Sequence, residues 1–281
     1  MFLICLTHDI EQLTPPYSTL GHIAAGALAA KTRRLVLDYV MGKESARKNP
    51  YDTFQDMLEL ERQYDATSTF FATPSVGVLS SSRLTELNRT GSEVALHGIG
   101  ESSRSVHELL RQKKALETVI DMEISGIRQH SLDIMIPRTF DFYKVAGFRY
   151  DATYFPPRYG QKRIYTPFFA VEGLVEFPLA FMDSDFSDMA SIGSDALNKT
   201  WGRIERILEE YRRNEGVCTI LWHPHAFFDE KNDFHRLFYM HFRGFRELYE
   251  RILRYGSENS DRMCTCRDAL SACEIKDSPM W

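Results

Sequence analysis

Short runs rich in β-branched and aromatic residues alternate with helix-like segments along almost the whole chain. Such alternation is typical of βα units, whose strands form a parallel sheet that the helices cover. The expected strands are residues 2–7, 68–73, 93–97, 125–128, 149–152, 174–179 and 217–223. About seven such units without a long linker predict an α/β fold, a closed or nearly closed barrel that makes residues 1–281 a single domain.

Three connecting segments have apolar residues at the i, i+3, i+4 spacing of an amphipathic helix. The clearest lies at 106–120, where Lys113 interrupts the stripe, and a second lies at 197–211. A third spans 140–146 and is followed by Gly147, a residue type that often ends a helix. Helices at these places fit the connections between successive parallel strands.

Residues 12–50 interrupt the alternation of strands and helices, and we expect them to form an insertion over the barrel mouth. They carry a Pro-Pro pair, an Ala-rich segment and a basic stretch at 43–48. The apolar run at 23–30 is too short to cross a bilayer, so no transmembrane segment is expected. The amphipathic pattern at 20–41, with its basic middle, leaves a peripheral membrane contact open.

Charge and cysteine content narrow the class of partner and the compartment. The formal net charge is -5 and the Lys and Arg residues are dispersed, which argues against a nucleic-acid partner. The chain opens without a basic leader and has an odd count of 5 cysteines, which together predict a cytoplasmic protein. The Cys264-x-Cys266 pair does not have the spacing of a standard zinc motif.

Ionisable side chains follow several of the expected strands, where turn residues would be usual. Asp9 and Glu11 follow the first strand, His97 the third, Arg128 the fourth and His223 the last. In a barrel of parallel strands these ends converge on the face that carries catalysis. The pattern therefore predicts one polar site built from separate strands.

The two acids of the first strand are two residues apart, so their side chains share a face. Two adjacent carboxylates repel each other unless a cation lies between them or one is protonated. This suits Asp9 as a general base and Glu11 as a metal ligand; a helix N-cap or a structural salt bridge is the alternative. An arginine such as Arg128 within reach of Asp9 would keep that carboxylate oriented and charged.

Neutral imidazole at a strand end is a common zinc ligand, and His97 fits that role. Glu101 lies four residues later and would reach the same side if the loop makes one helical turn. Gly98 and Gly100 favour an open loop instead, in which Glu101 would be a solvent-exposed glutamate.

The remaining polar residues leave their roles open. His223 and His225 are both placed to act as an acid, and we favour His223. His130 suits a ligand, an acid or a substrate contact. Asp151, which ends another strand, is expected to contact substrate or to orient a histidine.

The ordered sequence blocks resemble the polysaccharide deacetylase family, the NodB-like carbohydrate esterases. The blocks are Leu6-Thr7-His8-Asp9-Ile10-Glu11, Ser68-Thr69-Phe70-Phe71, Glu93-Val94-Ala95-Leu96-His97-Gly98, Gly126-Ile127-Arg128, Ala146-Gly147-Phe148-Arg149-Tyr150-Asp151-Ala152-Thr153 and Leu221-Trp222-His223. The resemblance implies a distorted (β/α)7 barrel of the NodB type and metal-dependent hydrolysis of an N-acetyl or related amide group.

By this resemblance Asp9 is the catalytic base, His223 the catalytic acid and Arg128 the arginine of the third motif. The metal motifs differ from the family pattern. Ile10 replaces the second aspartate of the first motif, so Glu11 becomes the nearest ligand, and Glu101 stands where the family has a second histidine beyond His97.

The expected function is removal of an N-acetyl or similar acyl group from a sugar or glycan precursor. The expected cofactor is a divalent metal ion, with zinc preferred, and the cytoplasmic prediction suggests a nucleotide-linked or lipid-linked substrate. The expected substrate contacts are His130, Asp151, Trp222 and His225. The alternatives are a non-catalytic, metal-free carbohydrate-binding relative and a hydrolase of another C–N bond, such as a cyclic amide.

Overall fold

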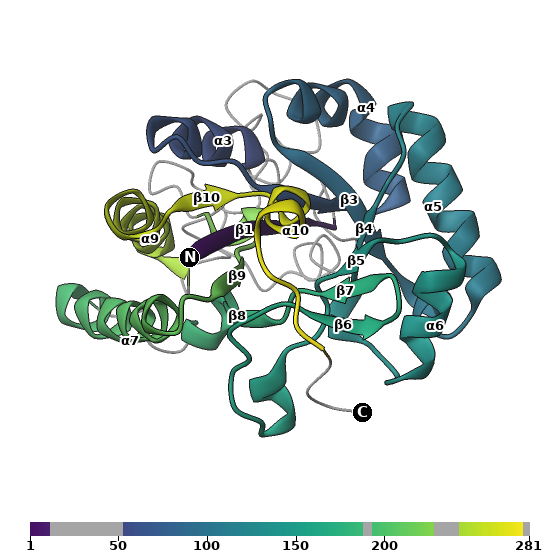
Figure 1. Cartoon of the computed structure of the whole chain (residues 1–281). Coiled ribbons are helices and arrows are strands. Elements are labelled where there is room, and N and C mark those ends of the chain that lie inside the picture. The colour runs from purple at the N-terminus through teal and green to yellow at the C-terminus, as the bar shows by residue number, and fades with distance from the viewer. Residues whose placement is uncertain (12–52, 188–192, 228–241, 278–281) are drawn as a thin grey trace, which may run out of the picture.

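The computed structural model of the chain describes residues 1–11, 53–187, 193–227 and 242–277 (Figure 1). The expected insertion at 12–50 and the amphipathic segment at 20–41 lie outside these residues. In the rest, strands and helices alternate along the chain, so the α/β class is confirmed.

One curled sheet organises the described part of the chain. Its strands are β1 (Leu3–Ile10), β2 (Thr69–Ala72), β3 (Glu93–Gly98), β4 (Gly126–Gln129), β5 (Tyr150–Asp151), β6 (Phe168–Val171), β7 (Leu174–Glu176), β8 (Leu179–Met182), β9 (Val217–Leu221) and β10 (Arg262–Cys264). The order across the sheet is β6-β7-β5-β4-β3-β2-β1-β9-β8, and β10 pairs with β1. These strands run parallel except for the β6–β7 hairpin, so their carboxyl ends share one side.

Helices surround the outside of this sheet (Figure 1). They are α3 (Phe54–Gln63), α4 (Pro74–Arg89), α5 (Val106–Ile120), α6 (Arg138–Val145), α7 (Gly193–Arg213) and α9 (Phe245–Asn259). The short helix α10 (Cys266–Ala272) packs against the interior cluster instead. The three helices expected from apolar spacing correspond to α5, α6 and α7. Both α5 and α4 begin at a residue whose side chain caps the helix, Ser105 and Thr73 respectively.

Alternate residues of β1 face opposite sides of the sheet. Ile4 and Leu6 pack outward into a core cluster with α7 and α9, whereas Leu3 and Cys5 belong to the cluster inside the barrel. The Asp9 side chain faces inward as those of Leu3 and Cys5 do, because strand side chains alternate with a period of two. The alternation that builds the core therefore also aims the strand-end acids into the barrel.

The interior cluster fills the end of the barrel opposite the strand-end acids. It joins Leu3 and Val217 to Cys264, Cys266 and other residues near α10. In Figure 1, α10 lies over the strands close to the centre of the view. The amino end of the barrel is thus packed shut, and access to the interior is left to the carboxyl end of the strands.

The sheet departs from the expected strands at 174–179. This run is divided into β7 and β8 around Pro178, which has no backbone N–H for a ladder. The described residues show no ladder between β8 and the β6–β7 hairpin, so the barrel is distorted rather than closed. The expected NodB-type distortion is confirmed at this level, while β6 and β10 were not predicted.

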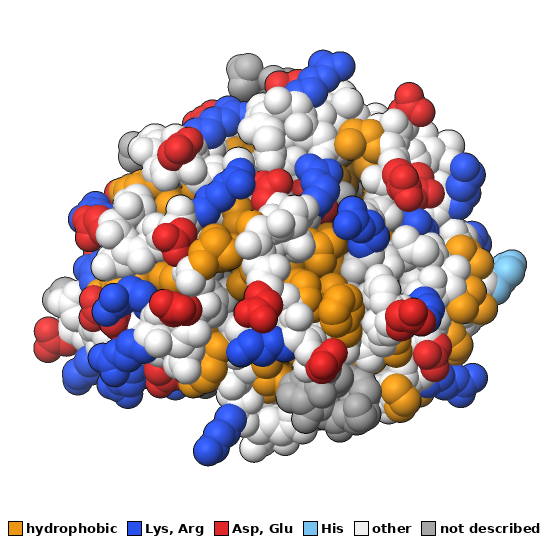
Figure 2. Space-filling view, viewed as in Figure 1, with side chains coloured by type: hydrophobic (Ala, Val, Ile, Leu, Met, Phe, Trp, Pro, Cys, Tyr) orange, Lys and Arg blue, Asp and Glu red, His pale blue; other side chains and the backbone are white. Residues whose placement is uncertain are grey.

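On the face seen in Figure 2, Lys and Arg side chains are interspersed with Asp and Glu, and no large region carries a single sign. Among the described residues, none of the helices has the length and apolar character needed to cross a membrane.

Candidate active site

A buried ion pair lies inside the barrel at the end of β1. Arg128 Nη1 donates to Asp9 Oδ1 at 3.0 Å and to Thr7 Oγ1 at 2.8 Å, and Arg128 Nε donates to the Ala152 carbonyl at 2.7 Å. Arg128 is fully buried and Asp9 is 4% exposed. The arginine therefore fixes one carboxylate oxygen of Asp9 and leaves Oδ2 facing His97, whose Nδ1 lies 3.9 Å away.

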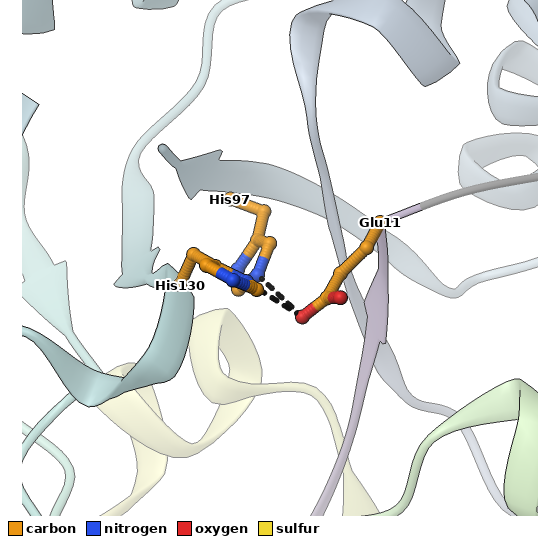
Figure 3. A group of neighbouring side chains, drawn as sticks. All are labelled: Glu11, His97 and His130. Carbon is orange, nitrogen blue, oxygen red and sulfur yellow. Dashed lines mark hydrogen bonds and ion pairs between the residues drawn. The ribbon is translucent and has the colours of Figure 1, made fainter. Parts of the chain in front are cut away.

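Glu11 points toward two neighbouring imidazoles, His97 and His130, beside this ion pair (Figure 3). Its Oε1 lies 2.8 Å from His130 Nδ1 and 3.4 Å from His97 Nε2. The three side chains come from the ends of β1, β3 and β4. Their donor atoms all lie within 4.8 Å of one another.

The charges in this cluster shift its titration. Burial alone would raise the pKa of Glu11, but hydrogen bonds with His130 and His97 outweigh it and lower that pKa well below its usual range. The hydrogen bond with Glu11 raises the pKa of His130. The carboxylate of Glu11 therefore favours its charged form, and the two imidazoles would bind a cation only as neutral ligands.

A strained turn places His130 in the cluster. It opens the short 3₁₀ segment η3 (His130–Leu132), in which Ser131 and Leu132 have φ values of 57° and 54°. Non-glycine residues rarely adopt this left-handed backbone, and such strain is concentrated at functional sites. Arg158 Nη1 donates to the Ser131 carbonyl at 2.5 Å and stabilises the turn.

A second buried carboxylate, Asp183, holds His223, which has a ring nitrogen within 4.8 Å of carboxylate oxygens of Asp9 and Glu11. Both oxygens of Asp183 lie 3.0 Å from His223 Nδ1, and the His223 backbone N–H donates to Asp183 Oδ2 at 2.6 Å. Burial opposes the charged imidazole, but the charge and hydrogen bond of Asp183 raise the pKa of His223 to about 9. The other ring nitrogen is left for a substrate.

These groups share one cavity of about 760 Å³. Asp9, Glu11, His130 and His223 line it together, although they come from strands far apart in sequence. Leu132, Phe155, Met182 and Leu221 supply an apolar wall. The convergence expected from the strand-end pattern is therefore present.

Asp183 was not among the predicted site residues. It follows β8 directly and opens the 3₁₀ segment η5 (Asp183–Phe186), so it carries the same signal as the other strand-end acids. The expected strand at 174–179 combined β7 with the first residue of β8, so the true end of β8 was not recognised. Ending one strand before Pro178 and beginning another after it would have placed Asp183 directly after a strand.

Glu101 is not part of the Glu11–His97–His130 cluster. The loop after His97 does make a helical turn, η2 (Gly100–Ser103), but the Glu101 side chain is exposed. It lines a neighbouring cavity of about 590 Å³ that also contacts His130. In this structure the imidazole of His130 occupies the place beside Glu11 and His97 that Glu101 was expected to take.

Two further predicted residues lie behind or beside the cavity. Asp151 is fully buried next to Glu176 in the β5–β7 register, and burial, opposed by hydrogen bonds from Glu176 and Thr153, raises the pKa of Asp151 to about 6. The His225 ring lies 4.9 Å from that of His223, but His225 is not among the residues that line the cavity.

The prediction that Trp222 contacts substrate needs correction. Its neighbours Leu221 and His223 face inward, so Trp222 points outward and is fully buried. Its ring lies 5.4 Å from that of Phe245 and 5.6 Å from that of Tyr249 on α9. The period-two alternation of a strand excludes Trp222 from the cavity that its neighbours line.

We expect Trp222→Ala to lower the free energy of unfolding by about 3–5 kcal/mol, because it removes a large side chain from a closed core. Urea unfolding followed by circular dichroism measures this loss. Trp222→Phe keeps most of the packing, and its KM should stay within about twofold of wild type. A KM raised tenfold in a stably folded Trp222→Phe protein would show that Trp222 contacts the substrate after all.

The donor set at Glu11 has the chemistry of a metal centre. One carboxylate and two imidazoles match the ligands of catalytic zinc sites that keep a position open for water or substrate. His97 is fully buried, and its Nε2, which lies 3.4 Å from Glu11 Oε1, is the ring nitrogen placed to bind an ion there. These residues therefore fit a divalent cation.

Solved structures of proteins classed as polysaccharide deacetylases share this curled barrel fold. A Mycobacterium smegmatis protein classed as a polysaccharide deacetylase aligns at 16% identity with a TM-score of 0.60, covering 96% of this chain and 89% of that one. A Pseudomonas aeruginosa PAO1 protein of the same class aligns at 13% identity with a TM-score of 0.58, covering 95% and 88%.

Puue allantoinase also aligns, at 13% identity with a TM-score of 0.57, covering 95% of this chain and 88% of that one. No family model matches the sequence, and no curated protein matches it. The resemblance drawn from the sequence blocks is thus confirmed at the level of the fold.

Proposed function

We propose that the protein is a metal-dependent hydrolase that removes an N-acetyl or similar acyl group from a sugar. One observation carries this proposal: Asp9, two members of the three-donor cluster (Glu11 and His130) and the carboxylate-held His223 line the same cavity. The fold shared with polysaccharide deacetylases supports it.

Two residues divide the proton transfers. Asp9, held by Arg128 through Oδ1, accepts the proton of the attacking water through its remaining oxygen. His223 donates a proton to the departing amine. Asp183 holds His223 Nδ1, so Nε2 is the atom that delivers this proton.

The proposed metal ligands are Glu11, His97 and His130. A divalent ion held there would polarise the acyl carbonyl as a Lewis acid. Two imidazoles and one carboxylate favour zinc or a similar ion over calcium or magnesium. This assignment keeps the expected Glu11 and His97 and replaces Glu101 by His130.

We expect His130→Ala to weaken metal affinity by about 10-fold to 100-fold or more, because it removes one of three protein ligands. Glu101→Gln should bind the metal as wild type does. Zinc titration by isothermal calorimetry on both variants makes the comparison. The opposite ranking, with Glu101→Gln weak and His130→Ala normal, would reject the ligand set.

The function is tested by acetate release from a panel of N-acetyl sugars with the zinc-loaded and chelator-treated protein. The proposal requires release by the loaded protein and its loss with chelator. Metal binding without turnover of any sugar favours a hydrolase of another C–N bond. Absence of both metal and turnover favours the non-catalytic carbohydrate-binding alternative.

A hydrolase of another C–N bond is the second candidate, and the structural likeness to an allantoinase favours it. The same base, acid and donor cluster would serve a cyclic amide. Allantoin and a cyclic imide added to the substrate panel separate the two candidates. The expected nucleotide-linked or lipid-linked substrate and the cytoplasmic location remain predictions.

A further inference from the structure

A buried histidine, His8, lies behind the active site among the apolar residues that β1 and β9 share with α3 and α9. Its Nδ1 lies 2.6 Å from the Trp222 carbonyl oxygen, and its Nε2 lies 2.8 Å from Glu61 Oε1. All three residues are fully buried. The proposed proton transfers use none of these side chains.

His8 and Trp222 are the sequence neighbours of the two groups that transfer protons. His8 directly precedes Asp9, and Trp222 directly precedes His223. The last register pair of the β1–β9 ladder lies one residue before each of them. The side chain of His8 therefore continues the connection between these two strands past the end of their backbone ladder.

The peptide unit that joins Trp222 to His223 is held at both of its polar groups. Its carbonyl accepts a hydrogen bond from His8 Nδ1, and its N–H donates to Asp183 Oδ2 at 2.6 Å. These two groups of a trans peptide point in opposite directions. Two buried side chains thus fix the peptide from opposite sides, directly before the proposed acid.

Glu61 fixes the orientation of the His8 ring. Its Oε1 also accepts a hydrogen bond from Tyr249 Oη at 2.6 Å, and its Oε2 accepts one from Ser68 Oγ at 2.7 Å. Burial and the charge of Glu61 raise the pKa of Tyr249, so its hydroxyl keeps the proton that it donates. A connected buried network of this kind makes its members rigid.

We infer that His8 is a positioning residue, which holds the Trp222 carbonyl and thereby sets the place of His223 relative to Asp9. A catalytic group misplaced by about 1 Å can lose about 10²-fold in rate. The inference rests on the proposed hydrolase, since it takes His223 as the proton donor to the departing amine.

Two substitutions separate the two contacts of His8. The amide nitrogen of His8→Asn can replace Nδ1 and donate to the Trp222 carbonyl, whereas that of His8→Gln can replace Nε2 and donate to Glu61. Each loses one buried hydrogen bond, so a merely structural role predicts similar turnover. His107→Gln, at an exposed position of α5, is the control.

The two variants are also made together with Glu61→Gln, because a buried carboxylate left without its partner can prevent folding. Urea unfolding establishes which proteins are folded. Steady-state kinetics on the folded, zinc-loaded proteins then use an N-acetyl sugar and an activated aryl acetate, whose leaving group needs no proton.

We expect kcat for the N-acetyl sugar to be at least about tenfold lower in His8→Gln than in His8→Asn, with KM within about twofold. On the aryl acetate the two variants should differ by less than about twofold, because that reaction does not need the proton of His223. Equal kcat values on the N-acetyl sugar, or the same difference on both substrates, would overturn the positioning role.

Crystal structures of the two variants separate failure of this inference from failure of the proposed function. A Trp222 carbonyl that is displaced in His8→Gln and in place in His8→Asn, with no acetate release even by wild type, retains the positioning contact and rejects the hydrolase. Acetate release by wild type and equally by both variants, with the carbonyl in place in both, retains the hydrolase and rejects the role of His8.

Discussion

Asp9→Asn is expected to lower kcat by about 10²-fold to 10⁴-fold, because the amide no longer accepts the proton of the attacking water. The substitution keeps the shape of the side chain and an oxygen for the hydrogen bond from Arg128 Nη1. KM should change little, since the substrate-binding surface is the same. Steady-state kinetics on the zinc-loaded variant measure the effect.

Stability and metal content must be followed in the same variant. Removing one charge from a buried pair leaves Arg128 uncompensated and costs about 3–5 kcal/mol. Asp268→Asn breaks an ion pair with Arg262 that is more than 30% exposed on both sides, so it is the matched control with little expected effect.

Asp9 is also close enough to Glu11 and His223 to form an alternative set of three donors. Loss of zinc from folded Asp9→Asn would make Asp9 a ligand. Turnover within tenfold of wild type in folded, zinc-bound Asp9→Asn would show that Asp9 is not the base.

His223→Gln is the second large expected effect, with a loss in kcat of about 10²-fold to 10⁴-fold for a substrate with a poor leaving group. A substrate whose leaving group needs no protonation, such as an activated aryl acetate, should be affected much less. This difference separates loss of the acid from general damage to the site. Equal losses on both substrates would contradict the role of His223.

The pH profile gives an independent test through Asp183. His223 must carry its proton to act as an acid, and its raised pKa of about 9 keeps it protonated at neutral pH. Activity should therefore fall as the pH rises through about 9. Asp183→Asn removes the charge that raises this pKa, so the alkaline limb should move toward lower pH. An unchanged limb would exclude His223 as its source.

The strand-end pattern predicted the location of the site because it depends on local geometry. Asp9 and Glu11 were placed on one side by the two-residue period, and parallel strands bring His97 and His223 to the same edge. These inferences require only strand direction and alternation. The barrel and the core of the site could thus be predicted from the sequence.

The features that were left open or wrongly predicted depend on turns and on packing. His130 joins Glu11 through the left-handed backbone of Ser131 and Leu132, which no residue type in that segment signals. Trp222 was assigned to the cavity although strand alternation points it away from the face of Leu221 and His223, and it packs against α9.

The proposed metal centre is tested most directly by a crystal structure of the protein grown with zinc. Anomalous diffraction measured at the zinc edge locates the ion. A peak about 2.0–2.2 Å from a Glu11 oxygen and from one nitrogen each of His97 and His130 is expected. Glu101 and Trp222 should make no contact with it. A peak bound by other residues, or no peak while Glu11 keeps its hydrogen bond to His130, would refute the metal site on which the proposed hydrolase depends.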